Sequence, residues 1–429
     1  MTWRGAALLV AALPVIAAGA AVPSLYGAGL GLLALAVAAV IVDGRRAPGR
    51  SRLAARREHD EILSAGAANQ IVVRIDVRDR AAEALVRDES PASSATTAMR
   101  WRGRVPAAIE YVVTPARRGE LSFGRTVIRT EGAWRLGWRQ TAVGEPETVR
   151  VDADLTAVRA FEALARRGQL AELGLRTMRL STEGSEFERI REAVPDDPPR
   201  AINWKATART GKLMATELVP ERAQPVIICL DHGRLMGVGA GALTKLDHAI
   251  NAALLLVHVA LRTGDRAGLL GFADTVTVAL GPRAGSTQLR RFLDAVRPMR
   301  PGETEADYDA TFAYFSRWQT RRSLVVIFTD VLDPDQGSAL IRQCARLRRR
   351  HLPLVVTVRD PAVVDAARAV PLTEEDAYAR AVASGLLADR EDTLRVLRLS
   401  GVETIDADTR TLSPRLVNRY LDLKRRSRI

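Results

Sequence analysis

Two aspartates directly follow apolar segments, and of all the residues in this sequence they are the best placed to bind a cation. Asp231 ends the run Pro225 to Leu230, and Asp330 ends the run Ser323 to Thr329. If both runs are strands of a parallel sheet, their carboxyl ends meet at one edge, where such sheets bind ligands. Two carboxylates with hydroxyl groups nearby suit a hard divalent cation such as Mg²⁺. The alternative is that both carboxylates only hydrogen-bond the neighbouring loops.

The remaining reactive side chains do not form a catalytic pattern. The stretch 210–212 (TGK) lacks the upstream glycine and the following hydroxyl of a phosphate-binding loop, and none of the 5 histidines lies in an H-E-x-x-H motif. His232 and Cys229 are close in sequence, but side chains alternate along a strand, which argues against a Cys-His pair. We therefore expect no enzyme activity. The alternative is a metal-dependent hydrolase that uses Asp231 and Asp330.

Uniformly apolar segments alternate with amphipathic ones around these aspartates. This rhythm predicts a parallel sheet covered by helices on both faces. The expected strands are 225–230, 268–272, 323–329 and 352–358, and the expected helices are 243–262, 286–296, 307–318 and 336–350. Cys229 and Cys344 both fall in apolar stretches, so we expect them to be buried small hydrophobes.

The N-terminus carries two uncharged apolar runs, Gly5 to Val22 and Tyr26 to Val42, separated by Pro23 and Ser24. A single helix through both would be about 57 Å long, far more than the roughly 30 Å of a bilayer core, so we expect a transmembrane hairpin. Six arginines follow within 45–57, and the positive-inside rule keeps them in the cytoplasm. The alternative is a cleaved signal peptide ending near Ala18-Gly19-Ala20.

The formal charge of the 429 residues is +13, which indicates an acidic partner. Because the clearest arginine cluster adjoins the apolar runs, we expect that partner to be membrane lipid. Aromatic residues make up only 5% of the chain. Binding to nucleic acid is not expected, because it needs basic residues interleaved with stacking aromatics.

Between the N-terminal runs and the α/β region, the apolar residues recur with period two. The segments 71–77, 108–113 and 125–129 read as short strands separated by glycine and proline turns, which predicts a small β-sandwich. The polar stretch 90–97 is expected to be a loop within it.

The stretch PDDPPRAINWKATAR, Pro195 to Arg209, combines prolines, paired aspartates, a tryptophan and cations. The prolines stiffen it, so that Asp197 can pair with Arg191, Arg200 or Arg209. We expect Ile202 and Trp204 to pack into a joint between domains. The stretch is then either a docking surface for a partner or an interdomain clamp.

The α/β region resembles a von Willebrand factor A domain. The resemblance rests on the apolar strand ending in Asp231, the phrase TGDRAGLLGF at 263–272 and the strand ending in Asp330. In that family a metal-ion-dependent adhesion site uses D-x-S-x-S, a threonine and a second aspartate. The resemblance implies Asp231, Thr304 and Asp330 as ligands, but Gly233 and Leu235 replace the two serines.

A second, more specific resemblance covers nearly the whole chain. The residues G-S-E-F at 184–187, Arg191 and the stretch 195–209 are similar to the signature of the bacterial domain of unknown function fifty-eight family. The turn and following strand at 117–138 also resemble that family, whereas Ala193 and Asp196 depart from its pattern. Its signature positions here are Glu186, Arg191, Asp197, Arg200, Trp204, Lys205 and Arg209. Because its members are commonly encoded beside MoxR-type AAA+ ATPases, the resemblance implies a membrane-tethered partner of such an ATPase.

The expected fold class is α/β: an N-terminal transmembrane hairpin, a β-sandwich-like domain and a doubly wound parallel-sheet, von Willebrand factor A-like domain. The expected parts are a hairpin at 1–43, a basic juxtamembrane linker at 44–68, a β-sandwich-like domain at 69–155, a helix with the signature loop at 156–223, the A-like domain at 224–370 and a helical extension with a basic tail at 371–429. The expected function is an adaptor or scaffold at the bacterial inner membrane, with its main domains in the cytoplasm.

Overall fold

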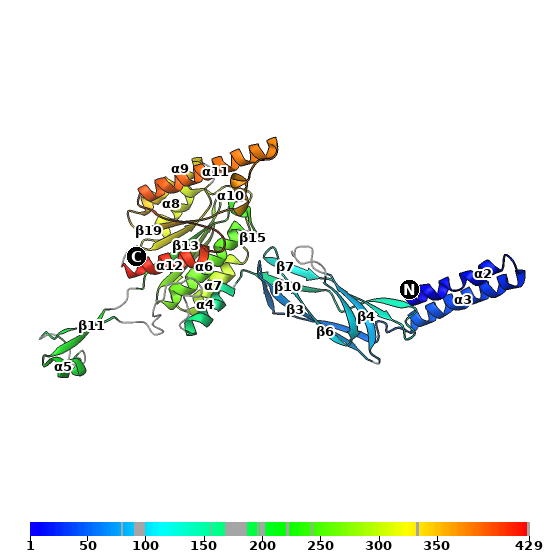
Figure 1. Cartoon of the computed structure of the whole chain (residues 1–429). Helices are drawn as coiled ribbons and strands as arrows, with labels where there is room; N and C mark the ends of the chain where they lie inside the picture. The colour runs from blue at the N-terminus through cyan, green and yellow to red at the C-terminus, as the bar shows by residue number, and fades with distance from the viewer. Residues whose placement is uncertain are drawn as a thin grey trace. The chain divides into compact units, whose positions relative to one another are not determined.

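The computed structural model describes residues 1–78, 80–89, 99–154, 156–167, 187–194, 197, 202–219, 223–241, 243–331 and 334–426. The chain has a mixed α/β fold and divides into two compact units, Met1–Asp154 and Leu155–Ile429. Figure 1 labels the elements of both units.

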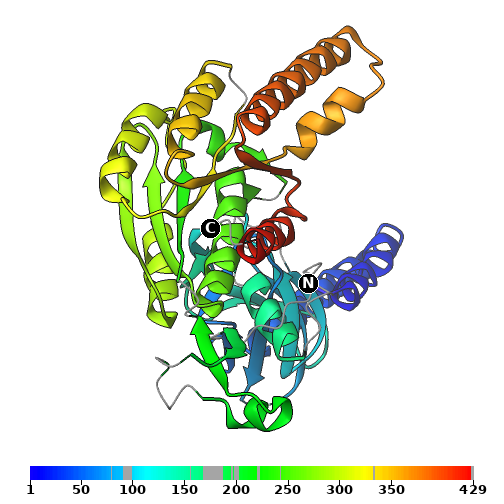
Figure 2. The ribbon, with the colours of Figure 1, turned by 90° about the vertical axis from the view of Figure 1, so that its left-hand side faces the viewer.

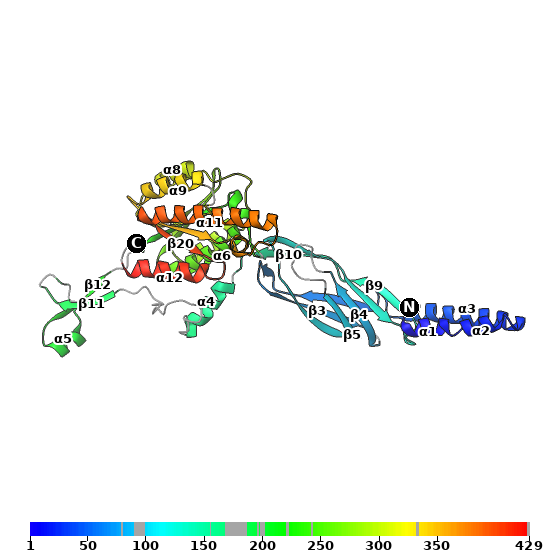
Figure 3. The same ribbon diagram turned by 45° about the horizontal axis from the view of Figure 1, so that its top comes forward.

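Three apolar helices open the first unit. They are α1 (Trp3–Val10), α2 (Leu13–Ala18) and α3 (Pro23–Arg46), and α1 and α2 run alongside α3 (Figure 3). The first apolar run forms two short helices and not a single one, because Pro14 lacks the N–H that would continue the ladder of hydrogen bonds. Among the described residues α3 alone is long and apolar enough to cross a membrane, as an anchor or a signal sequence.

The pair that α3 makes with α1 and α2, here called the helix pair, is tied to one turn at 132–137. The buried carboxylate of Asp43, near the end of α3, accepts hydrogen bonds from the backbone N–H groups of Trp134, Leu136 and Gly137 at 2.9, 2.7 and 3.0 Å. At the other end of the pair, the backbone N–H of Thr2 donates to the carbonyl of Leu136 at 3.1 Å. The start of α1 and the end of α3 therefore lie at the same turn.

In the part of this unit that the structure describes, ten strands follow and make three sheets. The orders are β1-β3-β6, β2-β10-β7 and β5-β4-β8-β9. The strands are β1 (Leu53–Glu58), β2 (Ile62–Ser64), β3 (Asn69–Val77), β4 (Ala82–Asp88), β5 (Met99–Val105), β6 (Ala107–Val113), β7 (Gly119–Phe123), β8 (Thr126–Glu131), β9 (Trp138–Val143) and β10 (Glu147–Asp152). Alternate residues of the first and third sheets, among them Val73, Val86 and Ile128, share one apolar core, as the period-two pattern predicts.

A buried polar network joins the strands of this core. The carboxylate of Asp88 accepts two hydrogen bonds from Arg57, at 2.6 and 2.9 Å, and one each from Tyr111 and Thr126, at 2.6 and 2.8 Å. Burial raises the pKa of Tyr111, and the Asp88 carboxylate raises it further, so the phenol stays a donor. The network satisfies both oxygens of a carboxylate that has no access to water.

The second unit is built on a six-stranded sheet of order β17-β16-β13-β18-β19-β20. All neighbours pair in parallel except the edge strand β17, which is antiparallel to β16. The strands are β13 (Pro225–Asp231), β16 (Arg266–Phe272), β17 (Val276–Arg283), β18 (Leu324–Phe328), β19 (Leu352–Val358) and β20 (Glu403–Ala407). The central strands are buried along their whole length, which explains their continuous apolar sequence.

Helices cover the sheet, and their apolar sides complete the core. The helices are α4 (Thr156–Arg167), α6 (Lys245–Arg262), α7 (Ser286–Val296), α8 (Tyr308–Trp318), α9 (Pro334–Leu347), α10 (Pro361–Arg368), α11 (Glu374–Leu399) and α12 (Leu412–Arg425). Alternate residues of β13, Ile227 and Cys229, pack with Phe312 of α8 and Cys344 of α9. Burial raises the pKa of the Cys229 and Cys344 thiols. Both cysteines are buried small hydrophobes, as expected.

The short elements of this unit are η3 (Arg234–Gly237), β14 (Gly239–Ala240) and β15 (Leu243–Thr244), and the strand–helix–strand group β11 (Phe187–Glu192), α5 (Trp204–Thr210) and β12 (Met214–Val219). The helices α10 and α11 pack together as a pair (Figure 2). The helix α6 begins with a capping box between Thr244 and Asp247, which satisfies backbone donors at its first turn.

Two expected boundaries differ from the structure. The segment 44–68, expected as a linker, contains the end of α3 and the strands β1 and β2. The segment 371–429, expected as a helical extension, supplies β20, which lies between α11 and α12 as the sixth strand of the sheet (Figure 3). In both segments the strands are short and rich in charged or polar residues, so their apolar periodicity is weak. The expected loop 90–97 lies outside the described residues.

Candidate functional site

Asp231 lies at the carboxyl end of β13 and is buried, with both carboxylate oxygens engaged. Oδ1 accepts from the backbone N–H of Gly233 at 2.7 Å, and Oδ2 accepts from the hydroxyl of Thr329 at 2.6 Å. Burial raises the pKa of Asp231 to about 6, although these two hydrogen bonds oppose the rise. The Tyr308 hydroxyl lies 2.7 Å from that of Thr329 and extends the chain of hydrogen bonds. The carboxylate therefore holds the loop after its own strand.

Asp330 follows β18 and is enclosed by two cationic side chains. Its Oδ2 accepts from the ammonium of Lys245 at 2.5 Å, and its Oδ1 accepts from the guanidinium of Arg390 and from the backbone N–H of Val331. Lys245 comes from the first turn of α6 and is 1% exposed; Arg390 comes from α11 and is 4% exposed. Their positive charges balance the negative charge of the buried Asp330 carboxylate, which would be costly to bury alone.

Arg390 also links this aspartate to a second one. Its guanidinium donates to Asp406 Oδ1 at 2.8 Å, and Arg359 donates to Asp406 Oδ2 at 2.6 Å. Burial opposes ionisation of Asp406, but the two guanidiniums outweigh it and lower the pKa of that carboxyl. Asp330, Arg390 and Asp406 therefore form a buried chain from the centre of the sheet to β20.

A divalent cation does not fit the strand-end aspartates as they are arranged. The Asp330 charge is already balanced by Lys245 and Arg390. Both Asp231 oxygens are engaged by Gly233 and Thr329, so Mg²⁺ would have to displace these partners. Mg²⁺ also demands near-octahedral oxygen ligands. Among the described residues no group of three or more histidine, cysteine or acidic side chains is arranged to hold a metal.

Thr304 belongs to the loop beside this edge but turns its side chain to solvent. Its backbone carbonyl accepts from the N–H of Arg234 at 2.8 Å. A Cβ at Gly233 would lie 3.0 Å from the Thr304 carbonyl oxygen and 3.1 Å from Asp231 Oδ1. Because that space is already filled, a serine of the adhesion-site pattern would crowd the loop. The structure brings Asp231 and Asp330 to one edge, without a Thr304 hydroxyl turned toward them.

The signature residues that the structure describes build the small group β11, α5 and β12. Arg191 of β11 donates two hydrogen bonds to the carboxylate of Asp197, both at 2.7 Å. The Arg191 guanidinium and the backbone N–H of Val194 lower the pKa of Asp197. Asn203 caps α5 by accepting from the N–H of Ala206 at 3.0 Å, and its own N–H donates to the carbonyl of Met214 at 2.8 Å. These bonds fix the start of α5.

Trp204 is the first residue of α5 and is 67% exposed. That Trp204 packs into a joint between domains remains a prediction. The side of α5 that carries Ala206 and Thr207 is half-buried instead. Thr207 accepts from the N–H of Met214 at 3.0 Å and thereby fastens α5 to β12. Lys205 and Arg209 are exposed on the same short helix.

Of the expected site residues, Asp197 and Arg191 come together, Trp204, Lys205 and Arg209 share α5, and Glu186 and Arg200 lie outside the described residues. Sequence reasoning missed Lys245, Arg390, Asp406, Tyr308 and Thr329. Lys245 could have been found from the sequence, because a lysine at the start of a helix expected to lie in the core needs a buried partner. No local signal marks Arg390, which lies 60 residues from its partner in a helix whose other buried residues are apolar.

The chain is thus a mixed α/β protein that carries an apolar N-terminal helix and an acidic sheet edge with internally paired charges. Residues 189–371 match the family described as "Protein of unknown function DUF58". The chain therefore contains a DUF58 family domain, as the signature predicts, and this match covers β11 through α10.

Relatives of this chain occur in bacteria. The chain is 26% identical over 243 residues to "Uncharacterized protein Rv1480" of Mycobacterium tuberculosis (strain ATCC 25618 / H37Rv), which covers 53% of this chain and 75% of that protein. The same figures hold for "Uncharacterized protein Mb1516" of Mycobacterium bovis (strain ATCC BAA-935 / AF2122/97).

Two solved structures share some similarity with this chain. The "conserved hypothetical protein BatB from Bacteroides thetaiotaomicron" is 13% identical, with a TM-score of 0.31, and the match covers 47% of this chain and 99% of that one. The "Uncharacterized Membrane Spanning Protein from Vibrio fischeri" is also 13% identical, with a TM-score of 0.16, covering 47% and 96%. Structural likeness at these TM-scores does not inform the function of this chain.

Proposed function

We propose that this protein is a membrane-anchored adaptor or scaffold that binds partner proteins and works with a MoxR-type AAA+ ATPase. The N-terminal helices form a transmembrane hairpin at the bacterial inner membrane. A β-sandwich and a von Willebrand factor A-like domain follow in the cytoplasm. The protein performs no catalysis in this proposal, and the signature group β11, α5 and β12 supplies the partner surface.

The observation that carries the proposal is the exposure of Trp204 on a braced helix. An exposed tryptophan presents a large apolar area to water, which is unfavourable. Tryptophan is also enriched among the residues that contribute most of the binding energy at protein interfaces. The hydrogen bonds of Asn203 and Thr207 hold α5 in place, and Asp197 binds Arg191 of β11. A preset surface loses little conformational entropy when it binds a partner.

The surroundings of Trp204 indicate the charge of the partner. Lys205 and Arg209 are exposed on the same helix, while Ile190 and Leu213 expose apolar side chains on the neighbouring strand and turn. Exposed basic residues beside an exposed tryptophan suit a partner that presents an apolar contact within an acidic surface. The ATPase itself is taken from the resemblance to the signature family.

The arrangement of the sheet edge also supports a role without catalysis. The Lys245 ammonium and the Arg390 guanidinium engage the Asp330 oxygens, and two hydrogen bonds engage those of Asp231. A general base or metal ligand needs an oxygen that a substrate or ion can reach. Here the same carboxylates hold α6, α11 and the loops at the edge in place.

A membrane anchor is supported by the outward surface of α3. The helix has 24 residues, which corresponds to about 36 Å and exceeds the roughly 30 Å of a bilayer core. Leu30, Leu35 and Ile41 expose apolar side chains along it. Because Thr2 and Asp43 bind the same turn, both ends of the helix pair lie on one side of the membrane in this proposal.

Site-specific photocrosslinking in intact membranes tests the partner surface. A benzoylphenylalanine at position 204 is expected to crosslink the MoxR-type ATPase. The matched control places the same probe at Tyr378, an exposed aromatic (74% exposed) on α11, outside the signature. Crosslinks to the ATPase at both positions, or at neither, would contradict the proposed surface.

Calorimetric titration with Mg²⁺ and Mn²⁺ separates this function from the metal-dependent hydrolase. The adaptor proposal predicts no heat of metal binding, because Lys245 and Arg390 already supply the positive charge that a metal ion would bring to Asp330. A heat of binding that disappears in Asp231→Ala, together with hydrolysis of any substrate by the parent protein, would replace the adaptor by the hydrolase.

A further inference from the structure

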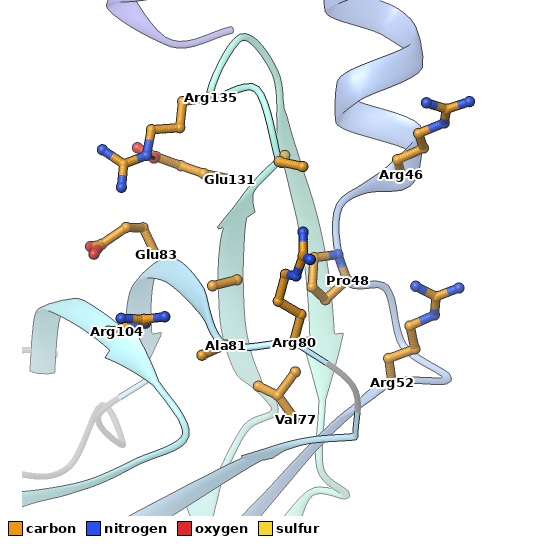
Figure 4. A pocket seen from close by; sticks show the side chains of 13 residues that line it. Arg46, Pro48, Arg52, Val77, Arg80, Ala81, Glu83, Arg104, Glu131 and Arg135 are labelled. Atoms are coloured by element: carbon orange, nitrogen blue, oxygen red, sulfur yellow. Dashed lines mark ion pairs between the residues drawn. The ribbon is translucent and has the colours of Figure 1, made fainter.

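An arginine-lined pocket lies where α3 meets the β-strands of the first unit. Figure 4 shows side chains from the end of α3, from the chain before β1 and β4, from β5 and from the turn after β8 around it. The pocket encloses about 460 Å³, within the range of about 300–1,000 Å³ for small-molecule sites. Its arginines are Arg46, Arg52, Arg80, Arg104 and Arg135.

The lining carries a net positive charge. Five arginines face two glutamates, Glu83 and Glu131, which leaves an excess of +3. The nearest approach of the Arg135 Nε to Glu131 is 4.0 Å, too long for a close ion pair, so the glutamate only partly offsets its charge. Planar guanidiniums donate in a fork that matches the oxygens of a phosphate group. The pocket therefore suits an anion with several oxygens.

The backbone of Arg135 supports a role for its side chain. Its φ is +58°, and among the described residues no other non-glycine residue has a positive φ. A side chain in this left-handed conformation costs free energy that glycine would avoid. Its own carbonyl accepts from the Thr2 hydroxyl at 2.5 Å, so the turn is anchored in this conformation. An arginine held there is projected at the pocket although the backbone favours glycine.

The position along α3 relates the pocket to the lipid surface. Arg46 is the last residue of α3 and lines the pocket. If α3 spans the roughly 30 Å hydrocarbon core, its remaining length of about 6 Å places Arg46 in the headgroup layer, which extends about 5–8 Å beyond the core on each side. The Arg46 guanidinium also lies 5.6 Å from the ring centre of Trp134, and tryptophan favours this interface.

We propose that this pocket binds a phosphate-bearing anion, taken either from the headgroup of an anionic phospholipid or from a soluble phosphate ester. The lipid source rests on the proposed membrane anchor, whereas phosphate binding by the arginines does not. The site fixes the first unit against the membrane surface at one headgroup. It is separate from the partner surface of the signature group, so the two proposals fail independently.

The test uses the full chain purified in an uncharged detergent and then placed in nanodiscs. In one arm, inorganic phosphate and glycerol 3-phosphate are titrated by calorimetry. In the other, native mass spectrometry counts lipids retained from discs of phosphatidylcholine alone or with phosphatidylglycerol. The test variant is Arg80→Gln/Arg104→Gln. The matched control, Arg87→Gln/Arg100→Gln, removes the same charge from two exposed positions that face each other on the β4–β5 ladder. Arg100 is four residues from Arg104, about 13 Å along the strand, and Arg87 is seven residues from Arg80.

At about 1 kcal/mol per arginine, the test variant is expected to bind phosphate or anionic lipid roughly 30-fold more weakly. The control is expected to stay within about threefold of the parent. Arg80→Lys/Arg104→Lys keeps the positive charge but removes the planar, paired donors of the guanidinium. An intermediate loss of affinity is expected. Binding of phosphatidylglycerol alone identifies the lipid source; binding of glycerol 3-phosphate alone identifies the soluble one. Equal losses in the test and control variants, or no binding in either arm, would overturn the proposal.

Discussion

Replacing Lys245 with methionine tests whether buried cations hold the strand-end carboxylate. Methionine keeps most of the apolar stem of lysine and removes the ammonium that lies 2.5 Å from Asp330. Arg390 remains, but it is shared with Asp406, so Asp330 loses the partner that serves it alone. Breaking one partner of a buried pair costs about 3–5 kcal/mol. For a domain of about this size, the melting midpoint would fall by roughly 6–20 °C.

Differential scanning calorimetry of the full chain in uncharged detergent measures this loss in the transition of the second unit. The double variant Lys245→Met/Asp330→Asn removes both charges and is expected to recover more than half of the lost stability. The matched control is Lys212→Met. It breaks a lysine–carboxylate pair of nearly the same length, 2.6 Å to Glu192, in which both side chains are exposed, so the midpoint should hardly move.

Two results would refute the reasoning. One is a Lys245→Met midpoint within about 2 °C of the parent, which would mean that water or a rearranged Arg390 replaces the ammonium at little cost. The other is a double variant no more stable than Lys245→Met, which would mean that the loss comes from packing of the lysine stem and not from the stranded carboxylate.

Three further predictions concern other parts of the chain. Asp88→Asn leaves Arg57 buried without its counter-charge and should cost about 3–5 kcal/mol in the transition of the first unit alone, as measured by calorimetry. Asp231 has a folded pKa of about 6, above its unfolded value of about 3.9, so the parent loses stability as the pH rises from about 4 to 6 and no more above that range. Urea unfolding should show Asp231→Asn gaining about 3 kcal/mol relative to the parent between pH 4 and pH 7; an unchanged difference would contradict the raised pKa. Trp204→Ala should abolish ATPase capture in a detergent pulldown while changing stability by less than about 0.5 kcal/mol, and a large loss of stability would mean that the side chain packs within the protein.

Much of the α/β fold was predictable because its strands are buried on both faces. The expected strand 352–358 and helix 286–296 coincide with β19 and α7. Such strands must be apolar along their whole length, and the helices that cover them must be amphipathic. Both patterns are local, so the sequence displays them directly.

The missed parts depend on contacts between distant residues. The strand β1 reads LAARRE and β20 reads ETIDA; both are too polar for a clear pattern, and pairing with a neighbour makes them strands. Lys245 lies 85 residues from Asp330, and Arg390 lies 60 residues from it. Only the fold brings these charges together. A pattern search at the strand ends therefore finds the carboxylates and misses the cations that neutralise them.

The attachment of the helix pair to the turn at 132–137 has a mechanical consequence. Asp43 contributes three hydrogen bonds to that turn, and Thr2, which precedes α1, contributes three more. A force on the β-strands would act on all of these hydrogen bonds at once. Several of them must then break together before the helices separate from the turn. If α3 spans the membrane as proposed, a force on the first unit would therefore act on the bilayer through these bonds and not through a flexible tether.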